Sequence, residues 1–175
     1  MKAITLYQPW ASLVALGEKR IETRGWATKY RGPLLIHSSK KANTEMCDQA
    51  VLYDCLQRLG NIKYPLGVVL AISNLVECIE ITPKLIDGLS VQEISFGDYT
   101  IGRFAWILED IHQLKIPVKA KGMQRLWNWD ETEHLVAIDP YAIGNTKIWT
   151  PRGVISGRKL DKPDEDAVMG LEVVA

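Results

Sequence analysis

The stretch Gly67–Ile81, GVVLAISNLVECIEI, decides the fold. It is rich in β-branched residues and almost continuously apolar, which is typical of a strand that is buried on both faces. Ser73 and Asn74 interrupt the apolar run and predict a bend near its middle. We expect this long strand to form the spine of a sheet, with the other strands arranged around it.

Shorter elements are predicted before this strand. Residues 2–6 alternate weakly between polar and apolar side chains, which favours a first strand. Residues 9–16 are mostly apolar, and they begin with Pro9 and end before Gly17, which predicts a helix with a proline start and a glycine stop. Residues 34–37 form a short apolar strand after a Gly-Pro break.

The remaining segments complete an α+β pattern. A packing helix is expected over residues 43–60, and residues 83–96 have short helical character. Residues 98–108 predict another strand, residues 109–110 begin a connection, and residues 114–118 resume extended structure. Several short strands with few helices between them indicate an α+β domain whose strands curl into a small mixed β-barrel with flanking helices.

The composition is that of a soluble globular protein. The 175 residues are 47% hydrophobic and 24% charged, and they predict one domain over residues 1–155 followed by a polar, acidic tail over 156–175. Neither an apolar run of membrane-spanning length nor a leader-like start is found, so we expect a cytoplasmic protein without membrane contact. The three cysteines and three histidines lack ligand spacing, so no metal or cofactor is expected.

The net charge of zero hides a segregation of charge along the chain. Residues 1–41 hold eight basic and two acidic residues, and residues 115–127 hold four basic and no acidic ones. Residues 42–114 hold four basic and ten acidic residues. If the fold brings the two basic segments together, they form a positive field that attracts phosphate; otherwise they are two solvated faces.

The segment Gly17–Trp26, GEKRIETRGW, concentrates mixed charge directly after the predicted first helix. Its β-branched residues flank a charge at every second position, which favours a strand. One face of that strand would carry Arg20, Glu22 and Arg24, and the other Lys19, Ile21 and Thr23. Lys19 and Glu22 can therefore enter one cleft only if a bulge or the end of the strand intervenes.

The second basic segment, KAKGMQRLWNWD at residues 119–130, mixes cations with aromatic rings. Lys119, Lys121 and Arg125 lie close in sequence to Trp127 and Trp129. Such a mixture can hold both the phosphate and the base of a single strand. Tryptophans at these positions fit a hydrophobic core equally well.

Four stretches of the chain resemble the ASCH domain family, named after the activating signal cointegrator-1 homology domain. They are QPWASLVALGEKRIETRGW, YRGPLLIHSSKK, YPLGVVLAISNLVECIEI and IPVKAKGMQRLWNW, and they cover roughly residues 4–130. The family motif G-x-K-x-x-E-x-R is present as Gly17, Lys19, Glu22 and Arg24. The resemblance implies a PUA-like β-barrel with a cleft beside this motif.

The resemblance also implies a module that binds nucleic acid, typically RNA, or a modified nucleoside. Tryptophans near the motif would stack a base, while hydroxyl and cationic side chains at the strand ends would contact phosphate. The candidate nucleic-acid-binding residues are Trp10, Lys19, Arg24, Trp26, Arg31, Ser38, Ser39, Lys40, Lys119 and Lys121.

Hydrolysis of RNA or of a modified nucleoside is the alternative, with Lys19 and Glu22 as the catalytic candidates. Small family members act as amidohydrolases on N4-acetylcytidine through a lysine, a threonine and a glutamate. Glu22 stands where their threonine would be, and Thr23 points to the other face of the strand, which puts this activity in doubt. Glu93 is the candidate for the catalytic glutamate of those members. A third alternative is a scaffold for protein partners that uses the acidic 42–114 segment.

Overall fold

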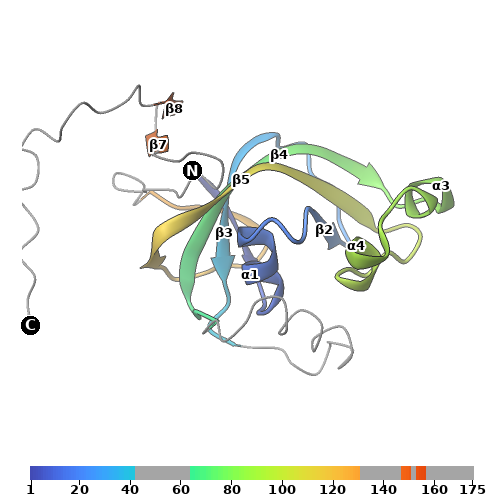
Figure 1. The fold of residues 1–175 in the computed structure, drawn as a ribbon, viewed down its shortest axis with the longest axis horizontal. Coiled ribbons are helices and arrows are strands. Elements are labelled where there is room, and N and C mark those ends of the chain that lie inside the picture. The colour runs from blue at the N-terminus through green and yellow to red at the C-terminus, as the bar shows by residue number, and fades with distance from the viewer. Residues whose placement is uncertain (42–63, 131–146, 151–152, 157–175) are drawn as a thin grey trace, which may run out of the picture.

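The computed structural model describes residues 1–41, 64–130, 147–150 and 153–156 (Figure 1). The main sheet has six strands in the order β2 (Ile21–Arg24), β5 (Phe104–Lys119), β4 (Val68–Glu80), β3 (Gly32–Ser38), β1 (Lys2–Leu6) and β6 (Leu126–Asn128). A second sheet pairs β7 (Lys147–Thr150) with β8 (Gly153–Ser156) in antiparallel orientation. The predicted helix over 43–60 and residues 157–175 of the predicted tail lie outside the described residues.

The predicted spine strand is confirmed as β4, which pairs antiparallel with β5 along most of its length. The pairing register shifts at three places, between Val69 and Ala71, between Ile72 and Asn74, and between Leu75 and Glu77. The second shift lies at the predicted bend. Each irregularity bends its strand and increases the local twist, and in Figure 1 the two long strands arch together over the rest of the domain.

The predicted connection at residues 109–110 is wrong, because β5 continues through it. Asp110 has a left-handed backbone with φ of 47°, yet strand pairing resumes on both sides, with Glu109 opposite Asn74 and His112 opposite Ile72. Two exposed acidic residues at a bulge have the sequence pattern of a turn, and the partner strand overrides that local pattern. The strand also starts at Phe104 and not at residue 98.

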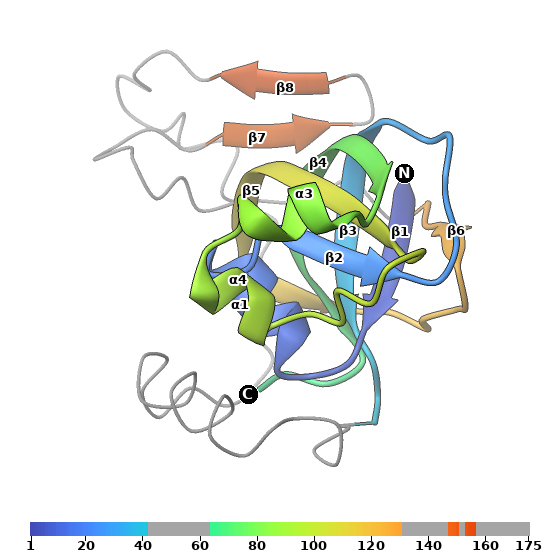
Figure 2. The ribbon, with the colours of Figure 1, turned by 90° about the vertical axis from the view of Figure 1, so that its right-hand side faces the viewer.

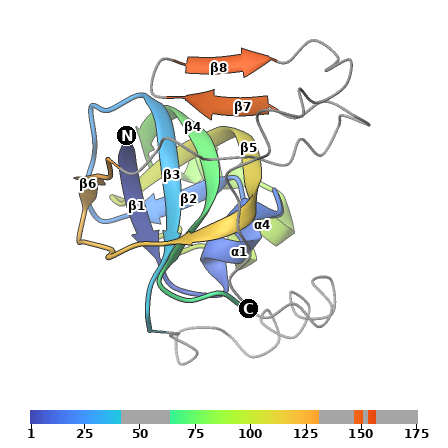
Figure 3. The same ribbon diagram turned by 90° about the vertical axis from the view of Figure 1, so that its left-hand side faces the viewer.

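The N-terminal elements follow the prediction. β1 pairs in parallel with β3, with Ala3 opposite Leu35, and on its other side pairs antiparallel with β6 (Figure 3). A parallel pair needs a crossover, which α1 (Trp10–Ala15) and β2 provide (Figure 2). The helix ends at Ala15 with Leu16 as its C-cap, and the next residue, Gly17, has a φ of 76° that suits a residue without a Cβ atom.

The central strands are buried on both faces, which explains their continuous apolar sequence. Successive residues of β3 and β4 alternate between two hydrophobic clusters. The first contains Ile4, Leu6, Leu34, Ile36, Val68, Leu70 and Trp106, among others. The second contains Ala3, Leu35, Val69, Ile72, Leu114, Trp127 and Trp129.

The architecture is therefore α+β, a curled mixed sheet flanked by α1 and by two short helices, α3 (Pro83–Asp87) and α4 (Val91–Ser95). The expected small mixed barrel with flanking helices is confirmed. In the part of the chain that the structure describes, every helix is too short or too polar to cross a membrane. Within the same ranges, His, Cys, Asp and Glu side chains do not gather in threes as a metal site would require.

Candidate functional site

Lys19 of the G-x-K-x-x-E-x-R motif is buried, with 1% of its surface exposed. Its ammonium donates a hydrogen bond to the carbonyl of Ile21 and lies 3.5 Å from a carboxylate oxygen of Glu93. Its backbone N–H donates to the carbonyl of Leu13 in α1 at 3.2 Å. Because a buried charge must be matched by an opposite charge and by hydrogen bonds, Glu93 is the residue that permits a lysine at this position.

Glu93 connects α4 to the start of β2 through hydrogen bonds. Its carboxylate accepts hydrogen bonds from the backbone N–H groups of Arg20 (2.9 Å) and Ile21 (3.2 Å) and from the hydroxyl of Tyr99 (3.2 Å). Burial is the largest cause that raises the pKa of the Tyr99 phenol, and the Glu93 and Glu22 carboxylates add to it. The phenol therefore stays protonated and remains a hydrogen-bond donor to Glu93.

Glu22 and Arg24 point to the other face of β2, as the strand alternation predicts. Arg24 Nε lies 3.1 Å from Glu22 Oε1, and Arg24 Nη2 donates to the carbonyl of Thr5 in β1 at 3.1 Å. The Arg24 side chain is 27% exposed, so its guanidinium is fixed in position and still reaches solvent. Lys19 and Glu22 thus do not meet in one open cleft.

Arg24 lines a surface hollow of about 500 Å³, which we call the Trp26 hollow. Its lining residues are Ile4, Thr5, Leu6, Tyr7, Arg24, Trp26, Ser39, Gly122, Met123, Gln124 and Arg125. The Trp26 ring is braced edge-on by Trp106, whose centroid is 4.6 Å away. The guanidinium carbon of Arg125 lies 5.9 Å from the Trp26 ring centroid, within range of a cation–π contact.

A second hollow of about 750 Å³, the Trp127 hollow, adjoins the first. It is lined by Lys40, Leu66, Gly67, Lys119, Ala120, Lys121, Met123, Trp127, Asn128, Trp129 and Asp130. Gly67 has φ of 68°, and a Cβ atom there would lie 2.9 Å from Cγ of Lys40. The glycine therefore lets the Lys40 stem lie flat against the backbone beside the hollow.

Residues 119–125, which we call the rim segment, supply lining residues to each hollow, and Met123 lines both. The rim segment is anchored to the sheet by a chain of hydrogen bonds. Trp127 Nε1 donates to Thr5 Oγ1 at 3.2 Å, and Thr5 Oγ1 donates to the Met123 carbonyl at 3.0 Å. A nitrogen of His37 lies 3.2 Å from the Ala120 carbonyl.

His37 supports the rim segment from below. Its side chain is 1% exposed, and a Cβ atom on Gly122 would lie 2.3 Å from His37 Cε1. Burial lowers the pKa of the imidazole, the charge of Lys40 lowers it further, and the hydrogen bond with Ala120 opposes both. The ring is thus kept neutral while it packs against the glycine.

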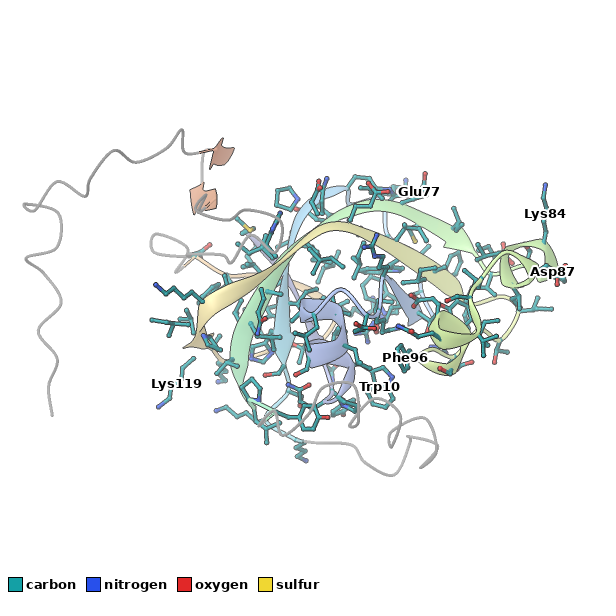
Figure 4. The ribbon with its side chains drawn as sticks, viewed as in Figure 1. Trp10, Glu77, Lys84, Asp87, Phe96 and Lys119 are labelled. Atoms are coloured by element: carbon teal, nitrogen blue, oxygen red, sulfur yellow. The ribbon has the colours of Figure 1, made fainter. Side chains whose placement is uncertain are left out.

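The structure brings together six of the ten predicted nucleic-acid-binding residues. Arg24, Trp26 and Ser39 line the Trp26 hollow, and Lys40, Lys119 and Lys121 line the Trp127 hollow. Figure 4 shows Lys119 projecting away from the end of β5.

The other four predicted residues lie elsewhere. Lys19 is buried beside Glu93, and Trp10 packs with Phe96 in a small hydrophobic cluster (Figure 4). Ser38 is fully buried, and its hydroxyl bonds to the backbone of Val68. Arg31 is paired with Glu77 on the surface.

Sequence reasoning did not single out Tyr7, Thr5 or Met123 as site residues. Tyr7 is 46% exposed and Met123 is 54% exposed, both at the hollows. An apolar side chain within a basic segment was the sequence feature that could have pointed to Met123. No feature of the sequence pointed to Thr5, because its role depends on the pairing of β1 with β6.

The fold and the site define a small α+β domain whose curled mixed sheet carries two surface hollows lined by cations and tryptophans. Residues 4–83 match the model of the ASCH domain. Over 137 residues the chain is 26% identical to activating signal cointegrator 1 of Mus musculus and of Homo sapiens, with 75% of this chain covered in each case. The chain spans about a fifth of the length of these relatives, since the match covers 22% of each.

Solved structures of an ASCH protein from Zymomonas mobilis are also similar to this chain. One aligns with a TM-score of 0.47 and 15% identity, covering 74% of this chain and 87% of the other. A mutant form of the same protein aligns with a TM-score of 0.46 and 16% identity, covering 74% and 88%.

Proposed function

We propose that this protein binds single-stranded nucleic acid, RNA in the first instance, along the two hollows and the rim segment between them. The observation that carries the proposal is that cations from separate parts of the chain line each hollow together with tryptophan, which is half-buried in the Trp26 hollow and buried in the Trp127 hollow. In the Trp26 hollow these are Trp26, Arg24 and Arg125. Flat rings hold bases of any sequence, and cations beside them hold the connecting phosphates.

The charge around the Trp127 hollow supports the same proposal. Lys40, Lys119 and Lys121 are exposed and come from two segments that are distant in sequence, with Asp130 as the acidic residue of the lining. The two basic segments of the chain thus meet at this hollow. The match of residues 4–83 to the ASCH domain model is further support, because that family resembles RNA-binding PUA domains.

The test is the salt dependence of binding to a short fluorescent single-stranded RNA. Each phosphate neutralised contributes a slope of about −0.7 in log affinity against log salt. We expect Lys121→Ala to weaken binding and to reduce that slope by about one contact. Lys84→Ala is the matched control, because Lys84 projects from α3 at the end of the molecule away from Lys119 (Figure 4). Salt-independent binding, or equal losses in both variants, would contradict the proposal.

Hydrolysis at the motif has weaker support. The Lys19 ammonium is engaged by Ile21 and Glu93, and Lys19 lines neither hollow. A substrate would have to displace Glu93 from its three hydrogen-bond donors to reach it. We therefore assign the motif lysine a structural role and the motif arginine, Arg24, a role in binding.

A further inference from the structure

Met123 stands between the two hollows. Of the residues that the structure describes, it alone lines both of them, and 54% of its surface is exposed although it lies within the basic 115–127 segment. Each hollow has its own cations, with the half-buried Trp26 ring in the first and the buried Trp127 and Trp129 rings beneath the second, so the site has two compartments with an apolar side chain between them. A single exposed apolar side chain is ordinary on a protein surface, so the informative feature is the position of Met123 between two cation-lined hollows.

We propose that Met123 is a wedge that separates two consecutive bases of the bound strand, so that one base occupies each hollow. This inference rests on the proposed function and identifies the ligand as a single strand that is unstacked at one step. Charge complementarity favours a polyanion as the occupant, because Arg24 and Arg125 line one compartment and Lys119 and Lys121 the other.

The backbone at Met123 is held firmly enough for a wedge. Its carbonyl accepts the Thr5 hydroxyl hydrogen bond at 3.0 Å. On one side Gly122 fits against His37 with no space for a Cβ atom, and on the other Leu126 pairs with Ile4 in the sheet. Arg125 adopts a left-handed conformation with φ of 58°, which is uncommon for a residue other than glycine. The exposed side chain therefore projects from a constrained turn.

The chemistry of methionine suits this role. A thioether is polarisable and makes favourable contacts with aromatic faces, so it can replace part of the stacking that two separated bases lose. Apolar side chains that enter a base step are a known means of unstacking it, at a cost of a few kcal/mol. Volumes of about 500 and 750 Å³ are in the range of pockets that hold small ligands, which suits one nucleotide in each.

The wedge makes specific demands on the ligand. A mononucleotide fills one compartment and a dinucleotide fills both, so affinity should rise sharply between these two lengths. A strand that is strongly stacked, such as oligoadenylate, must lose stacking on binding, whereas oligouridylate has little to lose. A continuous duplex cannot place successive bases in separate compartments and should bind weakly.

The experiment compares the wild type with Met123→Ala and with Met123→Leu, which retains a bulky apolar side chain. Binding to short oligoadenylate is followed by fluorescence anisotropy, and base stacking by circular dichroism of the same complex. We expect the wild type and Met123→Leu to reduce the stacking signal. Met123→Ala should leave the stacking signal intact and bind about tenfold more weakly, with an unchanged salt slope because the cations remain.

Two outcomes separate the wedge from the proposed function. If the wild type binds with the expected salt slope but Met123→Ala unstacks the strand equally well, the wedge is wrong and nucleic-acid binding stands. If the wild type binds neither oligoadenylate nor oligouridylate, the proposed function fails and the wedge fails with it. A thermal melt of each variant shows that it is folded.

Discussion

The ammonium of Lys19 and the carboxylate of Glu93 lie 3.5 Å apart inside the protein, and this pair joins β2 to α4. The same carboxylate accepts the N–H groups of Arg20 and Ile21. The lysine and the glutamate thus set the position of β2, and β2 in turn sets the position of Arg24 on its other face. The motif lysine therefore affects the site indirectly, by fixing the strand that carries Arg24.

Replacing Lys19 with Met should destabilise the fold, because it leaves the Glu93 charge buried without its partner. Breaking a buried pair in this way costs about 3–5 kcal/mol. The double variant Lys19→Met with Glu93→Gln should recover part of that loss in denaturant unfolding. Glu77→Ala is the control, since Glu77 pairs with Arg31 on the surface and should leave the midpoint nearly unchanged. A Lys19→Met protein as stable as the wild type would contradict the buried-pair account.

Tyr99→Phe should lower stability by about 1–2 kcal/mol, because it removes the donor to Glu93 and leaves a buried acceptor short of one bond. The raised pKa of Tyr99 adds a pH dependence. Its phenol keeps its proton in the folded protein above pH 10.0, its ordinary pKa, while the unfolded chain releases it. Stability should therefore be complete below pH 10 and fall as the pH rises, and Tyr99→Phe should flatten the decline. If the stability of the variant falls equally steeply above pH 10, other groups cause the decline.

Acid should weaken the protein through His37. Its pKa is lowered from 6.5 in the folded state, so the unfolded chain takes up the proton first as the pH falls. The stability that His37 contributes is present above pH 6.5 and is lost below it. We expect His37→Gln to reduce this acid sensitivity in unfolding experiments between neutral and mildly acidic pH. An unchanged acid limb would remove His37 from the account.

Gly122→Ala should displace the rim segment, because the added Cβ would approach His37 Nδ1 to 2.6 Å and Thr5 Oγ1 to 2.8 Å. Overpacking of this kind costs about 1–3 kcal/mol. RNA affinity should fall together with the melting temperature. Gly25→Ala is the matched control, since its Cβ would meet only Arg103 at 3.8 Å. Equal behaviour of the two alanine variants would show that the rim segment tolerates displacement.

Local patterns in the sequence predict β1 to β4, whereas β5 was divided in two and β6, β7 and β8 were not predicted. The apolar run from Gly67 to Ile81 predicts β4, and the alternation from Lys19 to Arg24 predicts which side chains of β2 share a face. These predictions succeed because burial on one or both faces imposes a period that the sequence displays directly.

The errors and omissions concern interactions between distant segments. The partner of Lys19 is a residue in α4, and only the fold brings Glu93 beside it. The bulge at Asp110 was interpreted as a connection because strand pairing with β4 is invisible in the local sequence. The role of Met123 depends on two hollows that meet only after β6 has paired with β1.

The order of the main sheet also bears on how the protein behaves at high concentration. Its two outermost strands are its shortest, with four residues in β2 and three in β6, while the long strands β4 and β5 lie inside. Free backbone groups along an outer strand are the template on which another chain can add a strand and begin to aggregate. Among the described strands β2 covers only Phe104–Ile107 of β5, and the rest of that edge is interrupted by the left-handed Asp110 and by Pro117, which make it a poor template. The apolar β4 lies between β3 and β5 and is protected by them for as long as the domain stays folded.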